Sequence, residues 1–112
     1  MKAEVTVQID VEELMDAVFN DIYSNTSPWI VEYTYDWEDS NRATTSVPIK
    51  YYDPDTDEVA SKEISPSDVV KAFQSCIGKR IWAQYVTTDF EWDALVSDYL
   101  VQIALFGKEI YA

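Results

Sequence analysis

Every second residue from Trp29 to Trp37 is aromatic or β-branched, which predicts a strand with one large apolar face. Trp29, Val31, Tyr33, Tyr35 and Trp37 lie on that face, and Ile30, Glu32, Thr34 and Asp36 point the other way. An aromatic face of this size must be covered, or it is an exposed patch that needs a partner. We favour a sheet face beneath helices, and the alternative is a self-association surface that includes an exposed edge strand.

The remaining strands are predicted from shorter alternations. Val5 to Ile9 reads as a first strand, and residues 47–51 and 59–64 read as two more, joined by turn residues from Asp53 to Asp57. Pro48 has no N–H, so it suits an edge or a bulge better than a central strand.

Three helices are predicted from their start signals and apolar spacing. The first begins after Asp10, with Glu13 completing a capping box, and the second begins at Ser65-Pro66-Ser67-Asp68. Gly78 could end the second helix, or residues 79–86 could extend it. Thr88 and Glu91 predict a third start, and Gly107 is placed to end that helix.

These elements predict an α+β fold in the order β-α-β-β-β-α-α. We expect a mostly antiparallel sheet of about four strands, with about three helices packed mainly on one face. With 112 residues, the chain has the size of a single domain, so residues 1–112 are expected to form one acidic globular unit.

The charge balance limits the classes of partner. The chain has 21 acidic residues against 8 basic ones, a net charge of -13 and no histidine. This charge disfavours direct binding to nucleic acids and to anionic membranes, because both are polyanions. Cys76 is the only cysteine, so no internal disulfide can form, and we expect a buried thiol and a cytoplasmic protein.

Few kinds of catalysis fit this composition. Without histidine there is no Ser-His or Cys-His nucleophile and no histidine-ligated zinc, and two glycines cannot build a phosphate loop. A pair of carboxylates remains a possible catalytic set. Asp53, Asp55 and Asp57 have calcium-loop spacing, but Glu58 and Ile64 occupy the sixth and twelfth positions, so a hairpin turn is favoured. We predict a non-enzyme without cofactor or metal.

Two acidic clusters contain aromatic residues. Their members are Asp36, Trp37, Glu38 and Asp39 in the first, and Asp89, Phe90, Glu91, Trp92 and Asp93 in the second. One interpretation is solvated loops and favourable helix starts. The functional interpretation is a surface for a basic partner, in which acids attract and aromatics anchor.

Both ends of the chain resemble small uncharacterised acidic proteins of tailed bacteriophages. The stretch from Val101 to Ala112 carries an apolar helix, a Phe-Gly turn and a closing aromatic, and the stretch from Val5 to Leu14 resembles their opening. Lys108 interrupts their usual Gly-Glu pair, and Ala112 stands where glycine often ends them. The resemblance covers about a fifth of the chain and implies the cytoplasm of an infected bacterium, with no assigned activity.

Together these observations predict a phage accessory protein that binds, and thereby inhibits, a basic or nucleic-acid-binding host protein. Within that class the acidic surface would act as a nucleic-acid mimic if its carboxylates had phosphate-like spacing. The alternative is an assembly module that forms homo-oligomers through its aromatic strand face or edge.

Overall fold

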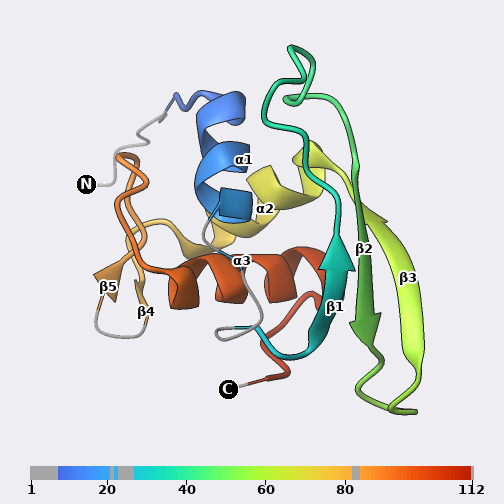
Figure 1. Cartoon of the computed structure of the whole chain (residues 1–112). Helices are drawn as coiled ribbons and strands as arrows, with labels where there is room; N and C mark the ends of the chain where they lie inside the picture. Colours follow the sequence, from blue (N-terminus) through green and yellow to red (C-terminus); the bar gives the residue numbers. More distant parts are fainter. Residues whose placement is uncertain (1–7, 21, 23–26, 82–83, 112) are drawn as a thin grey trace.

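Three helices lie on one side of a three-stranded antiparallel sheet (Figure 1). The protein is represented by a computed structural model, which describes residues 8–20, 22, 27–81 and 84–111. The helices are α1 (Val11–Asn20), α2 (Pro66–Cys76) and α3 (Ala94–Phe106), and the sheet contains β1 (Ile30–Tyr33), β2 (Val47–Tyr52) and β3 (Val59–Ile64). This is the predicted α+β class, with the helices on one face of the sheet.

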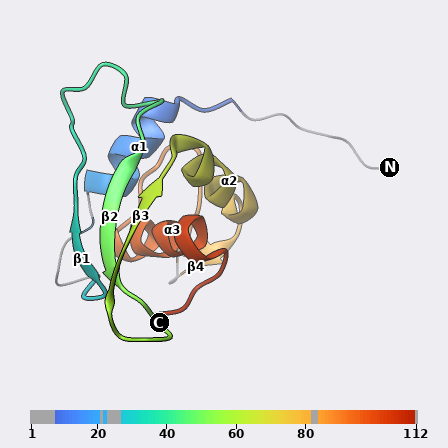
Figure 2. The same ribbon diagram turned by 90° about the vertical axis from the view of Figure 1, so that its right-hand side faces the viewer.

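The central strand of the sheet is β2, which pairs with β1 on one side and with β3 on the other (Figure 2). Val47, Ile49 and Tyr51 point toward the helices and are buried, whereas the residues between them are exposed. The β2–β3 register runs from Val47 opposite Ile64 to Tyr52 opposite Val59 without interruption. These two strands and their turn confirm the sequence prediction.

The aromatic strand is shorter and less regular than its pattern predicts. It ends at Tyr33 rather than Trp37, and the β1–β2 register shifts between Ile30 and Glu32. A bulge of this kind breaks the alternation of side chains. Val31 is therefore exposed although Trp29, on the same predicted face, is buried.

Pro48 lies in the central strand and away from the β1 bulge, so the prediction of an edge or bulge position was wrong. Proline is tolerated here because the backbone of Pro48 faces the end of β1. Its carbonyl accepts a hydrogen bond from the Thr34 amide at 3.1 Å. The reciprocal bond of an antiparallel pair would need a Pro48 N–H, and the chain leaves the sheet at this point.

The predicted strand from Val5 to Ile9 falls mostly outside the described residues. Gln8 and Ile9 are described and belong to no helix or strand. Among the described residues the main sheet therefore has three strands, and the remaining two strands are found elsewhere.

The described residues between 79 and 86 contain a strand pair and do not extend α2. The helix ends at Cys76, and Gly78 adopts a positive φ of 78°, which turns the chain away from the helix. The short strands β4 (Arg80–Ile81) and β5 (Gln84–Tyr85) then pair with each other, at the end of the helical layer far from the sheet (Figure 1).

The last helix begins later than its predicted capping box. Asp93 is the N-cap of α3, and its carboxylate accepts from the amides of Leu95 and Val96. Thr88 and Glu91 belong instead to the preceding turn, in which Phe90 has a φ of 57°. The C-terminal prediction is confirmed, because Gly107 caps α3 in the left-handed conformation.

The core lies between the helices and the inner face of the sheet, with α3 packed against both α1 and α2. Each helix and the sheet contribute fully buried side chains, and Cys76 is buried among them as expected. Representative members are Leu14, Val18, Phe19, Ile49, Ile64, Val69, Phe73, Val96 and Leu100. No helix in the described part of the chain is long and apolar enough to cross a membrane.

Candidate acidic binding surface

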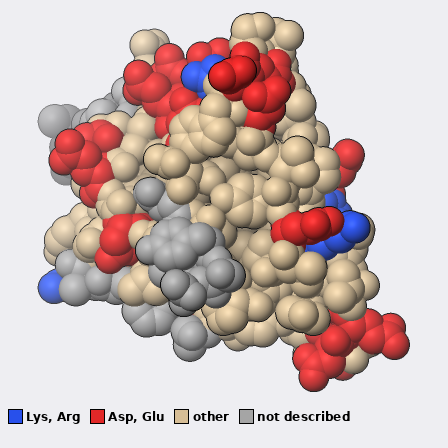
Figure 3. Space-filling view, in the orientation of Figure 1, with Lys and Arg blue, Asp and Glu red and all other residues tan. Residues whose placement is uncertain are grey.

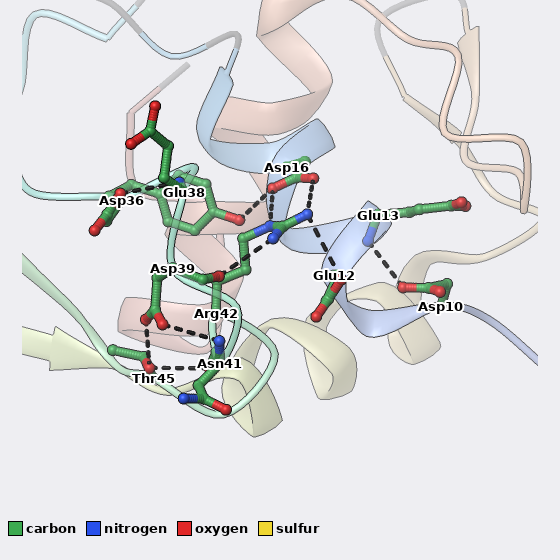
Figure 4. Close-up of polar contacts among 11 residues, drawn as sticks. Asp10, Glu12, Glu13, Asp16, Asp36, Glu38, Asp39, Asn41, Arg42 and Thr45 are labelled. Carbon is green, nitrogen blue, oxygen red and sulfur yellow. Dashed lines mark hydrogen bonds and ion pairs between the residues drawn. The ribbon is translucent and has the colours of Figure 1, made fainter.

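The first acidic cluster lies beside the start of α1, in the connection between β1 and β2 (residues 34–46). The two segments together form what we call the acidic α1–loop surface (Figure 4). The carboxylates of Asp16 and Glu12 contact the guanidinium of Arg42, and Trp37 lies within the same connection. The seven acidic residues are Asp10, Glu12, Glu13, Asp16, Asp36, Glu38 and Asp39.

Arg42 joins the connection to the helix. Its Nε donates to Asp16 Oδ1 at 2.8 Å and its Nη2 donates to Asp16 Oδ2 at 3.1 Å, a two-point contact. Nη1 also donates to the Asp39 carbonyl at 3.2 Å, and Glu12 lies 3.6 Å from Nη2. One side chain thereby fixes the position of the loop against α1.

Tyr35 completes this contact from the start of the 34–46 connection, two residues after β1. Its hydroxyl donates to Asp16 Oδ1 at 2.5 Å. Burial alone would raise the pKa of Asp16, but the hydrogen bonds from Arg42 and Tyr35 hold that pKa below its ordinary value. Burial and the adjacent Asp16 carboxylate raise the pKa of the Tyr35 phenol. Near neutral pH, Asp16 is therefore ionised and Tyr35 is a donor.

Two acids of the connection are engaged in its turns. Asp36 Oδ1 accepts from the Glu38 amide at 2.9 Å. Asp39 accepts from the Asn41 amide at 2.9 Å and from the Thr45 hydroxyl at 2.8 Å, and these bonds lower the pKa of Asp39. The loop is thus held by its own side chains as well as by Arg42.

The outer part of the surface stays open to solvent. Glu13 and Glu38 point away from Arg42 in Figure 4, and both are exposed. Trp37 is 44% exposed, and its ring meets Tyr35 edge-on with centroids 5.5 Å apart. An exposed indole beside fixed carboxylates is the combination that the sequence pattern indicates for an interface.

The second cluster is built differently, because its aromatics belong to the core. Trp92 is only 9% exposed, and its Nε1 donates to Ser97 at 2.9 Å. Phe90 is half-buried and meets Phe73 edge-on. Neither ring is presented to solvent as a large anchor, which favours the structural interpretation for these two residues.

The acids of the second cluster also have local partners. Asp93 caps α3 and exchanges hydrogen bonds with the Gln84 side chain. Asp89 accepts from the Thr87 hydroxyl and from the Glu91 amide, and these bonds lower the pKa of Asp89. Glu91 is exposed. A shallow depression of about 650 Å³ lies here, lined by Gln84, Tyr85, Thr87, Asp89, Glu91, Trp92 and Asp93.

Acidic side chains gather in separate groups on the face seen in Figure 3. One group covers the start of α1 and the 34–46 connection, a second lies toward the β5–α3 connection, and a third lies at the β2–β3 turn. Uncharged surface separates the groups. The acids on this face therefore form local patches rather than one continuous stripe.

Three of the four rings of the predicted aromatic strand are covered, as favoured from the sequence: those of Tyr33 and Tyr35 by Phe19 of α1, and that of Trp29 by Phe106 of α3 and by Tyr111. Trp29 is buried, and Tyr33 and Tyr35 are half-buried with their rings against Phe19. The Tyr33 hydroxyl donates to the carbonyls of Phe19 and Ile22, both at 2.8 Å. Trp37 alone of the strand's tyrosine and tryptophan residues is classed as exposed.

The Asp53–Asp57 segment is a hairpin turn closed by its own first residue. Asp53 Oδ1 accepts from the amides of Asp55 and Thr56, a local bond typical of turns. Among the described residues, no group of three or more carboxylates or thiols is placed to hold a metal ion.

The sequence pattern did not identify the contact at the centre of the acidic α1–loop surface. Arg42 and Asp16 are separated by 26 residues, and an arginine in a polar connection carries no signal of its partner. Comparison of the chain with protein-family models, curated proteins and solved structures found no match.

Proposed function

We propose that this chain is a non-enzymatic binding protein whose acidic α1–loop surface engages a basic patch on another protein. The observation that carries the proposal is the fixed position of the 34–46 connection. Arg42 and Tyr35 both bond to Asp16, while Trp37, Glu13 and Glu38 stay exposed beside them. A loop that is already ordered loses less conformational entropy on binding than a mobile one.

Charge supports a basic partner. Seven carboxylates and one guanidinium form the surface, so its local field is negative and attracts lysine- and arginine-rich surfaces. Long-range attraction of this kind speeds association and weakens as salt screens it. The exposed Trp37 ring supplies apolar area, and it also offers a face on which a cation can stack.

The resemblance at the two ends of the chain supports a partner in an infected bacterium. We propose a host protein, and specifically one whose basic surface ordinarily meets nucleic acid. Separate acidic groups fit a compact basic patch better than a long duplex-binding groove. Local patch binding is therefore the form of inhibition that we favour over mimicry of an extended nucleic acid.

The test compares two triple variants with the same change in charge. Glu13→Gln, Asp36→Asn and Glu38→Gln neutralise the proposed surface, and Asp36→Asn keeps the oxygen that accepts from the Glu38 amide. The matched control neutralises Asp55, Asp57 and Glu58 of the β2–β3 turn in the same way. Asparagine tolerates the positive φ of 62° at Asp57.

The measurement is retention of bacterial lysate proteins on each immobilised variant at low and at high salt. We expect the unaltered protein and the turn control to retain the same basic protein at low salt, and the surface variant to lose it. Failure of the unaltered protein to retain any basic protein at low salt would sink the proposed function. Equal loss in both triple variants would show that net charge, not this surface, is responsible.

A further inference from the structure

The segment that follows α3 is bound by the protein as a peptide ligand would be. Gly107, with a φ of 78°, ends the helix and turns the chain back. Residues 107–110 are exposed, and the chain then meets the side chain of Gln102 at residues 110 and 111. The contact is made by the anchored end of a segment that is otherwise open to solvent.

Gln102 recognises the backbone of this segment. Its Oε1 accepts from the amides of Ile110 and Tyr111, both at 2.8 Å, and its Nε2 donates to the Tyr111 carbonyl at 2.9 Å. The second Nε2 hydrogen goes to Asp98 Oδ1 at 2.5 Å. All four hydrogen-bonding positions of the amide are thus used, and Gln102 itself is fully buried.

Asp98 holds Gln102 and Trp29 in place behind the segment. Asp98 is 7% exposed, and its carboxylate accepts from Trp29 Nε1 at 2.8 Å and from the Ser27 hydroxyl. The bond from Gln102 Nε2 to Asp98 does not involve the segment, so it can orient the amide of Gln102 when the segment is absent. The receptor half of the contact is therefore pre-organised by α3 and by residues 27–29.

Tyr111 is the side chain that this site selects. Its ring is stacked on Trp29 with centroids 5.4 Å apart and planes 9° apart, and it also contacts Phe106. The Tyr111 hydroxyl donates to the Tyr52 carbonyl at 2.9 Å. Ile110 is 36% exposed, so the residue before the tyrosine contributes its backbone more than its side chain.

We propose that Gln102, Trp29 and the Tyr52 carbonyl form a peptide-binding site that Ile110 and Tyr111 fill in cis. When residues 110–111 leave, the site accepts an extended peptide. That peptide carries a tyrosine in the place of Tyr111, and the residue before the tyrosine supplies a backbone N–H as Ile110 does. A short tether gives the chain's own segment a millimolar effective concentration, so the site is closed to weak ligands until that segment leaves.

The first test uses native-state hydrogen exchange to measure how readily residues 110–111 leave the site in the unaltered protein. The amides of Ile110 and Tyr111 should be protected by Gln102 and yet exchange at least about 100-fold faster than those of Leu100 and Val101 in α3. Equal protection would mean that the segment leaves only on global unfolding, and that result would overturn the proposal without any variant.

The second test uses the full chain with Tyr111→Ala and a fluorescent Lys-Glu-Ile-Tyr-Ala peptide. Fluorescence anisotropy should show saturable binding, at least about tenfold tighter than to the unaltered chain, whose own segment competes. A Lys-Glu-Ile-Ala-Ala peptide and the double variant with Gln102→Leu should each bind at least about tenfold more weakly. Absence of binding of the Lys-Glu-Ile-Tyr-Ala peptide to the Tyr111→Ala chain would refute the site. Equal affinity in all of these protein and peptide combinations would refute it as well.

Discussion

Arg42 contacts Asp16 through two nitrogens, at 2.8 and 3.1 Å, and thereby attaches a loop of the sheet to the first helix. Tyr35 approaches the same carboxylate from the strand side. Helix α1 and two parts of the 34–46 connection therefore meet at one ionised group. The dependence of the free energy of unfolding on pH should therefore show whether the Asp16 carboxylate is ionised.

We expect Asp16→Asn to destabilise the fold by about 1–3 kcal/mol at pH 6, because a hydrogen bond to a charged group contributes this much. The pKa of Asp16 is lowered in the folded protein. Its contribution is therefore present above the unfolded pKa, about 4, and is lost as the pH falls through the folded value. Urea unfolding at pH 6 and pH 3 should show the difference between the two proteins shrinking in acid.

Glu38→Gln is the control for this experiment. Glu38 lies in the same connection and is exposed, and in the part of the chain that the structure describes its carboxylate has no bonded partner. Its stability difference from the unaltered protein should stay small at both pH values. A difference for Asp16→Asn that is the same at pH 3 as at pH 6 would contradict the assigned role of the ionised carboxylate.

Trp37→Ala should weaken binding of the basic partner by at least about 2 kcal/mol, or roughly 30-fold, as expected for an aromatic hot spot. The ring is 44% exposed and contacts Tyr35 edge-on, so stability should fall by only about 1 kcal/mol. Titration of the retained partner, beside a thermal unfolding curve, separates the two effects. Unchanged affinity would remove Trp37 from the interface.

Asp93→Ala should destabilise the protein by about 1 kcal/mol, because it removes the N-cap of α3. Thr88→Ala is the matched control, since Thr88 is the cap that the sequence predicts and the structure does not use. Its effect on urea unfolding should be within about 0.5 kcal/mol. If Thr88→Ala lowered the free energy of unfolding more than Asp93→Ala, the helix would begin at Thr88, as the sequence predicts.

Asp98→Ala should cost about 3 kcal/mol or more, because it leaves buried donors of Ser27, Trp29 and Gln102 without their acceptor. Asp98→Asn retains one acceptor oxygen and should cost less. Denaturant unfolding of both variants measures this order. A loss below about 1 kcal/mol for Asp98→Ala would show that the network does little for stability.

Lys62→Val should promote self-association through β3. In the described sheet β3 is an edge strand, and Lys62 lies opposite Ile49, in register with the buried positions. Its Nζ donates to the Leu105 carbonyl at 3.3 Å near the end of α3. An inward-pointing charge is a common protection of an open edge.

Sedimentation velocity over a concentration series would measure this effect. Lys50→Val, in the central strand, is the matched control and should remain unchanged. If Lys62→Val sediments as the unaltered protein does at every concentration, then Lys62 does not protect the edge.

The fold was predictable wherever local signals agree with packing. Alternation placed β2 and β3, and the Ser65–Asp68 capping box placed the start of α2. Thr88 failed as a cap because Asp93 offers its carboxylate to the helix amides that are actually free. Thr88 and Asp93 are both residue types that commonly cap helices, so residue type alone does not choose between them. The packing of Phe90 and Trp92 against Phe73 keeps the residues after Thr88 out of the helix.

The position of the candidate surface was predictable from the sequence, but the contacts that hold it in place were not. Acids and aromatics near Asp36 to Asp39 were visible in the sequence, and the Trp37 ring is indeed exposed. The similar pattern at Phe90 and Trp92 describes packed core residues. The spacing of residues in a loop does not show which side chains face the interior. The two clusters therefore look alike in composition and differ only in how deeply their aromatic residues are buried.

Pro48 has a consequence for the path of the whole connection. Thr34 donates to its carbonyl, and the return bond would require a hydrogen that the proline nitrogen does not carry. A residue with an N–H at this position would add one bond between the two strands. The connection that carries Trp37 thus leaves the sheet at the place where the backbone lacks a hydrogen-bond donor.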